Sequence, residues 1–283
     1  MFLYKVYAPA PALQPFVNNY SIVENSVPVV HNILPKAALI LGIKYGGNME
    51  LSTQDQVVSE GFVSGLMGIQ DSYRVFSKTA NTGMLAINFT EAGAGAFFNV
   101  PLNELYNSGY TLDLFVRNSS AAQLEEEISI ARSADERVRI AERFLFSILR
   151  QQEQDKIILA SLEAIRQANG IIRTDDLARQ LYISSSRFEK RFRNVVGTSP
   201  KKFASMIRIE SIIKGYQNNS PLTKLAYDSG YFDQAHFNRD FKNYTGLSPK
   251  QLFANWMVGT GNVQQPCGFI YGGDVMPVRT NNI

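Results

Sequence analysis

The 283-residue sequence is poor in the side chains that most catalytic and metal sites require. Its one cysteine, Cys267, excludes a disulfide within the chain and a cysteine-rich zinc site. Only two histidines, His31 and His236, are present, too few for a histidine-rich metal cup, and a Ser-His-Asp triad would have to use one of them. Paired-carboxylate and cysteine motifs are missing too. We therefore predict no catalytic residues, no cofactor and no metal, and a protein that is not an enzyme.

Long apolar runs are also missing. No run approaches the ~18 residues that a bilayer-spanning helix needs. The apolar start is interrupted by Lys5 and followed by three prolines, which argues against a secretory signal. We expect a soluble, cytoplasmic protein with no membrane partner.

Charge is small in total, at +3, but it is unevenly distributed. The segment from Asp155 to Val258 holds 16 Lys and Arg against 9 Asp and Glu, a net charge of +7. The remainder holds 12 against 16, a net charge of −4. A basic segment joined to an acidic one favours binding to a polyanion, although a solvated charged surface would give the same counts.

The first ninety residues are typical of short strands, with many Val, Ile and aromatic residues between turn signals. The predicted strands are Phe2–Ala8, Val29–Leu34, Ala37–Tyr45, Gln56–Val63 and Gly83–Phe89. Regular short strands indicate a small barrel or sandwich. Its Phe and Tyr residues belong mostly to the core, with a small-molecule pocket as the alternative, and His31 is expected to be a hydrogen-bonded core group.

Helical patterns begin at Thr90, where Thr90-Glu91 resembles an N-cap followed by an acidic first turn, and this pattern predicts a helix through Phe98. Further helices are predicted at Ala121–Ala131 and Asp135–Leu149. The apolar stripe of the latter is expected to bury Phe144 and Ile148, either within the domain or against a second copy of the chain. Gly93-Ala94-Gly95 lacks the third glycine of a dinucleotide loop, which favours close packing.

These patterns predict an α+β protein with three parts. Residues 1–150 form a regulatory domain, β-rich over 1–90 and helical over 91–150, and the polar stretch Gln151–Gln154 is the junction. Residues 155–256 form an all-α domain. The tail, 257–283, is either mobile or contains a final strand near Phe269–Tyr271.

The helical part contains an internal repeat, Leu177–Phe203 and Leu225–Phe253. Leu177-Ala178 recurs 48 residues later, and five further residues recur 49 residues later, so one residue has been added in the second copy. Those five are Phe188, Phe192, Gly197, Ser199 and Pro200, which match Phe237, Phe241, Gly246, Ser248 and Pro249. Each copy predicts a short helix, a turn and a second helix, which ends at glycine before Ser-Pro starts the next helix.

Aromatic residues four apart share one helix face, so they are expected to anchor each second helix to the core. The opposite face is polar and partly basic, as a reader of the major groove requires. Its candidate DNA-binding residues are Ser185, Ser186, Glu189, Lys190 and Arg193 in the first copy, and Gln234, Ala235, His236, Asn238, Arg239 and Lys242 in the second. A plain helical bundle with a charged surface is the alternative.

The second copy, LAYDSGYFDQAHFNRDFKNYTGLSP, closely resembles the signature of the AraC/XylS family of bacterial transcription regulators. The resemblance covers residues 155–256 and implies a seven-helix module with two helix-turn-helix subdomains that binds promoter DNA. Carried over from the family, the base-reading positions are Ser186, Glu189, Lys190, Gln234, Ala235, His236 and Arg239. Ser186, which is small, and Glu189, which is acidic, depart from the larger or basic side chains usual at these positions. The Glu189 carboxylate could accept a hydrogen bond from cytosine N4, or it could repel phosphate.

The N-terminal part, with MLAINFTEAGAGAFFNVPLNEL and SADERVRIAERFLFSIL, resembles an uncharacterised regulatory domain found in a subset of these regulators. That resemblance implies a cupin-like barrel followed by a helical dimer or linker segment. The predicted function is transcription regulation, with double-stranded promoter DNA as partner. RNA polymerase, a small-molecule effector and a second copy of the chain are further candidate partners. The competing hypotheses are an enzymatic N-terminal barrel and a protein-interaction module. The sequence does not distinguish activation from repression.

Overall fold

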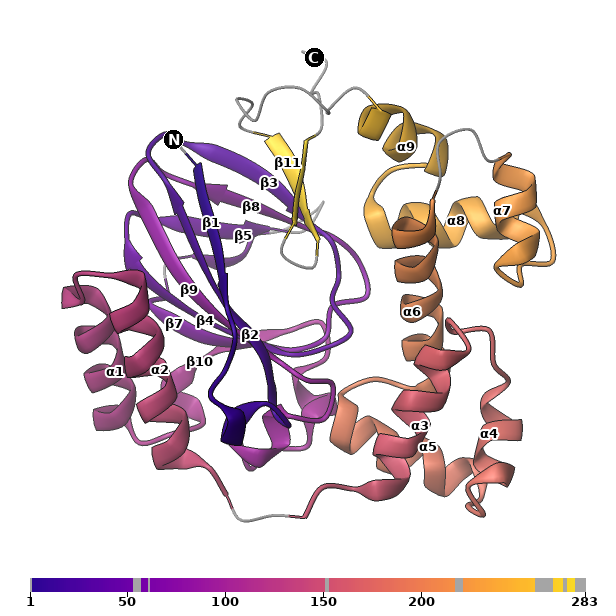
Figure 1. Ribbon diagram of the computed structural model, residues 1–283, viewed down its shortest axis with the longest axis horizontal. Coiled ribbons are helices and arrows are strands. Elements are labelled where there is room, and N and C mark those ends of the chain that lie inside the picture. Colours follow the sequence, from indigo (N-terminus) through magenta and orange to yellow (C-terminus); the bar gives the residue numbers. More distant parts are fainter. Residues whose placement is uncertain are drawn as a thin grey trace.

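The computed structural model describes residues 2–52, 57–60, 62–150, 153–216, 221–257, 267–271 and 274–277. Its strands form two six-stranded sheets that face each other, which is the sandwich of the two alternatives predicted from the sequence (Figure 1). The cupin-like barrel implied by the resemblance is not closed. The first sheet has the strand order β1 (Phe2–Tyr7), β2 (Val17–Asn25), β9 (Thr82–Phe89), β4 (Ile40–Gly46), β7 (Ser64–Met67) and β10 (Gly109–Thr111). The second has the order β12 (Asp274–Pro277), β11 (Cys267–Tyr271), β3 (Val29–Ile33), β8 (Arg74–Lys78), β5 (Met49–Ser52) and β6 (Val57–Glu60).

Every strand pair is antiparallel except that of β11 with β3, in which Phe269 lies opposite Asn32. The C-terminal tail thus adds strands to the N-terminal sheet, one of the two alternatives left open by the sequence. His31 lies in β3, but its side chain is outside the described part, so its predicted core role stays a prediction.

The predicted helix from Thr90 to Phe98 is wrong. The structure has only the short 3-10 helix Ala94–Ala96 there, followed by two more, Leu102–Leu105 and Leu112–Leu114. A Cβ atom on Gly93 would lie 2.0 Å from the carbonyl oxygen of Phe16, so the chain is packed tightly against the turn that precedes β2. This close approach, rather than helix propensity, decides the backbone path.

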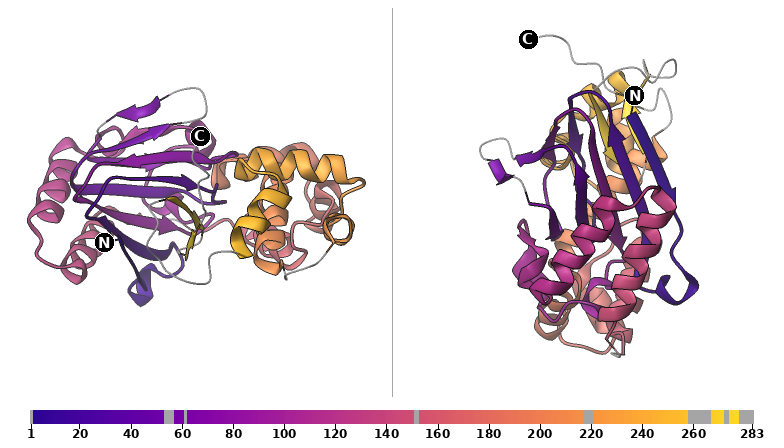
Figure 2. Two further views of the ribbon diagram at one scale, coloured as in Figure 1. Left: turned by 90° about the horizontal axis from the view of Figure 1, so that it is seen from above. Right: turned by 90° about the vertical axis from the view of Figure 1, so that its left-hand side faces the viewer.

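Helices α1 (Asn118–Ile130) and α2 (Ala134–Ile148) pack on the side of the strand domain that faces away from the helical domain (Figure 2). Ser133 caps α2 by accepting a hydrogen bond from the backbone N–H of Glu136, and the Glu136 carboxylate accepts one from the N–H of Arg132. Phe144 is buried in the core as predicted, and Ile148 is half-buried against it. The stripe therefore packs within its own domain.

Seven helices follow in the described chain: α3 (Lys156–Gln167), α4 (Thr174–Gln180), α5 (Ser185–Val196), α6 (Pro200–Gly215), α7 (Leu222–Asp228), α8 (Gln234–Thr245) and α9 (Pro249–Met257). The long helix α6 lies between the group α3–α5 and the group α7–α9 (Figure 1). Of the helices in the described ranges, none has the length and apolarity to cross a bilayer.

Candidate nucleic-acid interface

The helices α5 and α8 begin and end in similar ways. Asp233 caps α8 by accepting a hydrogen bond from the backbone N–H of His236 at 2.7 Å. Ser184 occupies the corresponding position before α5, but its side chain makes no capping hydrogen bond. Both helices end at a glycine in the left-handed region, Gly197 with φ +98° and Gly246 with φ +80°. Only glycine adopts that backbone without strain, so both stops follow from local sequence.

Buried aromatic rings hold both helices in the same manner. Phe188 and Phe192 in α5 are buried, with ring centroids 5.7 Å apart, and Phe192 contacts Phe203 of α6 at 5.6 Å. The same chain of contacts recurs in the second subdomain, where the rings of Phe237 and Phe241 in α8 are 5.6 Å apart, and Phe241 lies 5.5 Å from Phe253 of α9. The sequence repeat is therefore also a repeat of packing.

The turns that precede α5 and α8 also match. The N–H of Ile183 donates to the carbonyl of Ala178 and the N–H of Tyr231 to that of Ala226, both at 3.1 Å. Gly230 has a φ of +73° and its counterpart Tyr182 a φ of +55°, so the glycine sits where the left-handed backbone requires it. The residue added in the second copy is then Phe232, whose exposed fraction is 98%. Sequence reasoning noted the insertion but not this exposed aromatic side chain.

On α5, all five candidate residues, Ser185, Ser186, Glu189, Lys190 and Arg193, are exposed. Glu189 forms an ion pair with Arg193, with Nη2 and Oε1 2.8 Å apart. Arg193 also donates from Nε to the same carboxylate oxygen at 3.0 Å. The acidic group is thus neutralised by its own helix, which reduces the repulsion that an isolated carboxylate would exert on phosphate.

On α8, the residues Gln234, Ala235, His236, Arg239 and Lys242 are exposed, whereas Asn238 is half-buried. The Gln234 amide oxygen accepts a hydrogen bond from Thr223 at 3.3 Å, and His236 Nε2 lies 3.3 Å from a carboxylate oxygen of Asp240. Within the described ranges, no carboxylate pairs with Arg239 or Lys242. Their charges remain available to an external anion.

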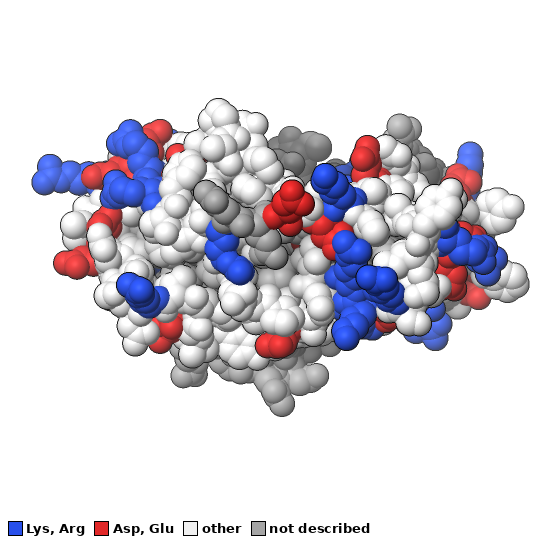
Figure 3. All heavy atoms as spheres, turned by 90° about the horizontal axis from the view of Figure 1, so that it is seen from below, with Lys and Arg blue, Asp and Glu red and all other residues white. Residues whose placement is uncertain are grey.

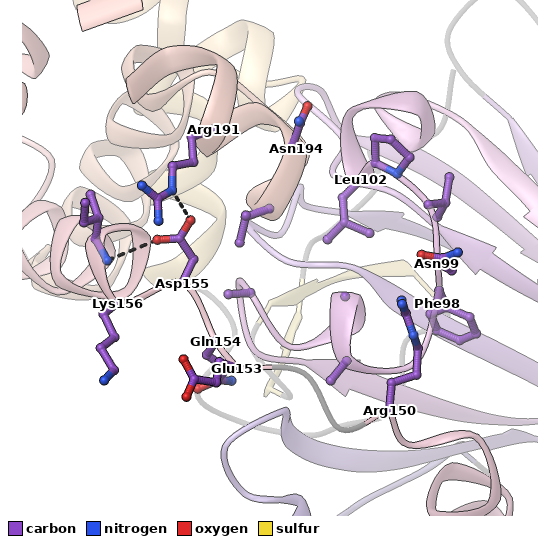
Figure 4. Close-up of a pocket in the computed structure, with 17 residues that line it drawn as sticks. Phe98, Asn99, Leu102, Arg150, Glu153, Gln154, Asp155, Lys156, Arg191 and Asn194 are labelled. Carbon is purple, nitrogen blue, oxygen red and sulfur yellow. Dashed lines mark hydrogen bonds and ion pairs between the residues drawn. The ribbon is translucent and has the colours of Figure 1, made fainter. Parts of the chain in front are cut away.

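Arg191 lies on α5 between the candidate DNA-binding residues Lys190 and Arg193, but its side chain binds another part of the protein. It forms an ion pair with Asp155, which also caps α3 by accepting hydrogen bonds from the N–H groups of Ile157 and Ile158, both at 3.1 Å (Figure 4). The pair lines a cleft of about 640 Å³ between the two domains, with Arg150 and Leu102 on its other side.

Figure 3 shows lysine and arginine side chains gathered on the underside of the helical domain.

Both subdomains contact the strand domain. The Tyr244 hydroxyl of α8 donates to the carbonyl oxygen of Pro35 at 2.7 Å. Lys202 of α6 pairs with Asp71 at 3.1 Å. Burial raises the pKa of Asp71, but Lys202 and hydrogen bonds from Tyr106 and Asn107 outweigh it, so the pKa is lowered overall. These two contacts, together with the ion pair between Arg166 of α3 and Glu91, dock the helical domain on the strand domain.

A second cavity, which we call the intersheet cavity, lies between the two sheets. Its lining includes Gly42, Gly65 and Ala86 of the first sheet, Phe76 of the second, and Lys36 of the loop between β3 and β4. The same loop carries Pro35, the acceptor for Tyr244 of α8. The cavity and the second helix-turn-helix subdomain thus share one loop.

The helical repeat and the strand-rich part match different protein families. Residues 177–255 match the family described as a helix-turn-helix domain, and residues 5–111 match a domain of unknown function, DUF6597. An uncharacterised HTH-type transcriptional regulator of Haemophilus influenzae is 32% identical over 128 residues, which are 44% of this chain and 41% of that protein. The chain therefore spans about two fifths of the length of the curated relative that it matches.

Solved structures with a similar layout share little sequence. ToxT from Vibrio cholerae O395 is 14% identical with a TM-score of 0.43, covering 88% of this chain and 100% of that one. The C-terminal domain of AraT, a response regulator from Geobacillus stearothermophilus, is 20% identical with a TM-score of 0.36, covering 39% and 94%. At these scores the resemblance carries no conclusion about ligands. The family match over residues 177–255 agrees with the duplicated, aromatic-anchored helices, and this part of the chain is a helix-turn-helix domain.

Proposed function

We propose that the chain is a sequence-specific DNA-binding transcription regulator of the AraC/XylS type. The observation that carries the proposal is that α5 and α8, anchored by equivalent aromatic rings, both expose polar side chains from their N-terminal halves. A helix presented in this way can enter the major groove and contact base edges. The surplus of positive charge in residues 155–258 favours association with the phosphate backbone.

The side chains divide by chemistry into base readers and phosphate holders. In α8, Gln234 and Asn238 suit adenine and Arg239 suits the O6 and N7 of guanine. Lys190 and Lys242, together with the serine hydroxyls at the start of α5, suit phosphate oxygens. If both helices enter successive major grooves on one face of DNA, their separation is about 34 Å, one helical turn.

Arg239→Ala tests this assignment. Preferred duplexes are first selected from a random pool with the full-length protein, and their affinities are then measured by gel-shift titration. The variant should lose about 1–3 kcal/mol of specific affinity and relax the base preference at one position, because a bidentate contact to guanine is lost. The matched control is Arg143→Ala on α2, also exposed but far from α5 and α8. Equal affinity of the Arg239 variant and the wild type would remove this side chain from the interface.

Failure to select any duplex, or a lack of DNA affinity even at low salt, would contradict the function itself. That result would favour the alternative in which the helical repeats bind a protein. The polar, cation-bearing faces of α5 and α8 fit nucleic acid better than they fit an apolar partner groove.

We further propose that the strand domain controls the helical domain by sensing a small molecule. This idea is supported by the intersheet cavity and by the hydrogen bond between Tyr244 and Pro35, which ties α8 to the loop at its rim. Contact with RNA polymerase and dimer formation stay predictions. Because α2 buries its apolar stripe within its own domain, a dimer would need another surface, and light scattering in solution tests for one.

A further inference from the structure

The walls of the intersheet cavity are apolar, and small residues make room for it. Alternate residues of β4, β7 and β9 face it, because side chains in a strand point to opposite sides with a period of two. Gly42, Gly65 and Ala86 supply almost no side-chain volume, and Met67 and Met84 line the space beside them. The result is a cavity of about 100 Å³.

Positive groups line this apolar space. Arg74 and Lys78, on the same face of β8 as Phe76, are 7% and 4% exposed. Lys36 enters from the loop between β3 and β4 and donates a hydrogen bond to the Asn88 amide oxygen at 2.9 Å. Half-buried Lys44 adds a fourth cation. The described lining residues include no aspartate or glutamate.

Two of these cations have donors without partners. Among the described residues, none accepts a hydrogen bond from the Lys78 ammonium group, whose nitrogen lies 6.0 Å from the centre of the Phe76 ring. The guanidinium of Arg74 donates to Ser72 and Gln70, but its Nε is buried with no partner. Burial of an uncompensated charge costs free energy, and it lowers the pKa of Lys78 to about 8. A ligand that brings a negative charge would offset that cost.

We propose that the intersheet cavity binds a small organic carboxylate, whose apolar body packs between the sheets and whose charge pairs with Lys78, Arg74 or Lys36. The proposal rests on the sensing role proposed above and names the chemical class of the ligand that is sensed. The volume of the intersheet cavity also limits the size of the ligand. An apolar cavity of about 150 Å³ holds benzene, whereas pockets for drug-sized ligands are about 300–1,000 Å³. At about 100 Å³ the intersheet cavity is smaller than either, so a short chain fits best and a single ring needs the flexible side chains of Met67 and Met84 to move. A long acyl chain does not fit without opening of the sheets.

The position of Lys36 connects the ligand to the DNA-binding helices. Glu210 of α6 attracts the Lys36 ammonium group, which is otherwise destabilised by burial. The neighbouring Pro35 accepts the hydrogen bond from Tyr244 of α8. A carboxylate in the cavity competes with Glu210 for Lys36, so occupancy changes the balance of contacts at α6 and α8.

The test uses the full-length protein without DNA, and four probes: benzoate, hexanoate and their uncharged counterparts benzyl alcohol and hexan-1-ol. Binding is followed at pH 7 by calorimetric titration, and by the rise in Tm relative to each protein's own ligand-free value. We expect at least one carboxylate to bind with a Kd below about 1 mM and at least tenfold more tightly than its alcohol.

Variants locate the site. Lys78→Met or Lys36→Met should weaken carboxylate binding at least tenfold, whereas the control Lys5→Met, at an exposed position of β1, should not. Gly42→Leu should abolish binding by filling the cavity. A Cβ there would meet only Met84 Sδ at 3.8 Å, so a larger side chain can enter without a backbone clash.

Equal binding of the alcohols, binding that survives both lysine variants and Gly42→Leu, or no binding of either carboxylate would each overturn the proposal. Carboxylate binding that leaves the affinity for selected DNA unchanged would support the anion site and contradict the sensing role. If the same preparation binds a carboxylate but binds no DNA, the result would contradict the proposed regulator function and not the carboxylate site.

Discussion

Replacing Lys78 with methionine should stabilise the protein at neutral pH. The ammonium group is 4% exposed, and burial alone lowers its pKa from 10.5 to about 8. Each unit of difference between the folded and unfolded states corresponds to about 1.4 kcal/mol, so the charged lysine costs about 3 kcal/mol of folding free energy at pH 7 as an upper bound. Methionine fills similar volume without a charge to desolvate. The gain of about 3 kcal/mol corresponds to a rise in Tm of about 6–12 °C for a domain of this size.

The same reasoning fixes the pH dependence. Below pH 8 the lysine is protonated in both states, and the wild type bears the full cost. Between pH 8 and 10.5 the unfolded chain binds more protons than the folded one, so the stability of the wild type rises with pH. The advantage of Lys78→Met should therefore be complete at pH 7, smaller at pH 9 and absent above pH 10.5. Tyrosines titrate in both proteins alike, and their contribution cancels in the difference.

Thermal unfolding followed by circular dichroism at pH 7, 9 and 10.5, without ligand, measures this difference. Lys5→Met is the control, because an exposed lysine should change stability by no more than about 0.5 kcal/mol at any of these values. A variant less stable than the wild type at pH 7, or a gain that persists unchanged at pH 10.5, would refute the view that Lys78 is a buried, uncompensated cation.

Three further predictions concern the helical domain and its docking. Phe232→Ala should weaken binding to selected DNA while leaving Tm unchanged, because the ring is 98% exposed and precedes α8; equal affinity would exclude it from the interface. Phe241→Ala should destabilise the second subdomain by about 3–5 kcal/mol in denaturant titration, since its buried ring joins α8 to α9, and a loss below about 1 kcal/mol would contradict that role. Tyr244→Phe should remove the hydrogen bond to Pro35 at a cost of about 1 kcal/mol and speed hydrogen exchange in the loop between β3 and β4; unchanged exchange would show that this bond does not tie the domains together.

Local signals in the sequence were sufficient for the two helix-turn-helix units. Three features of these units depend only on neighbours within one or two helical turns. They are the helix ends at Gly197 and Gly246, the left-handed turn at Gly230 and the aromatic pairs four residues apart. The repeat supplied a second, independent copy of the same pattern. The roles of the individual readers remain predictions, because exposure on α5 and α8 is a condition for DNA contact and not a measurement of it.

The strand domain was predicted less well, because sheet pairing depends on residues far apart in sequence. β2 and β8 were not predicted, although each is an interior strand of its sheet. The predicted strand Gln56–Val63 contains β6 (Val57–Glu60), while its residues Gln56 and Gly61 lie outside the described part of the chain. The helix predicted from Thr90 gave way to the close packing of Gly93 on Phe16. In each case a contact across the fold outweighed the local preference of the chain.

The amino-acid sequence by itself determined the helical domain, its internal repeat, its stops and its polar faces, because those features follow from the periodicity and backbone preferences of adjacent residues. Only the tertiary structure decided that Lys36, Arg74 and Lys78 line one apolar cavity, and that Pro35 beside it holds α8. Residues that are distant in sequence meet there because two sheets stack face to face, and the electrostatic cost of a buried charge depends on that assembled environment rather than on the neighbours of the residue along the chain.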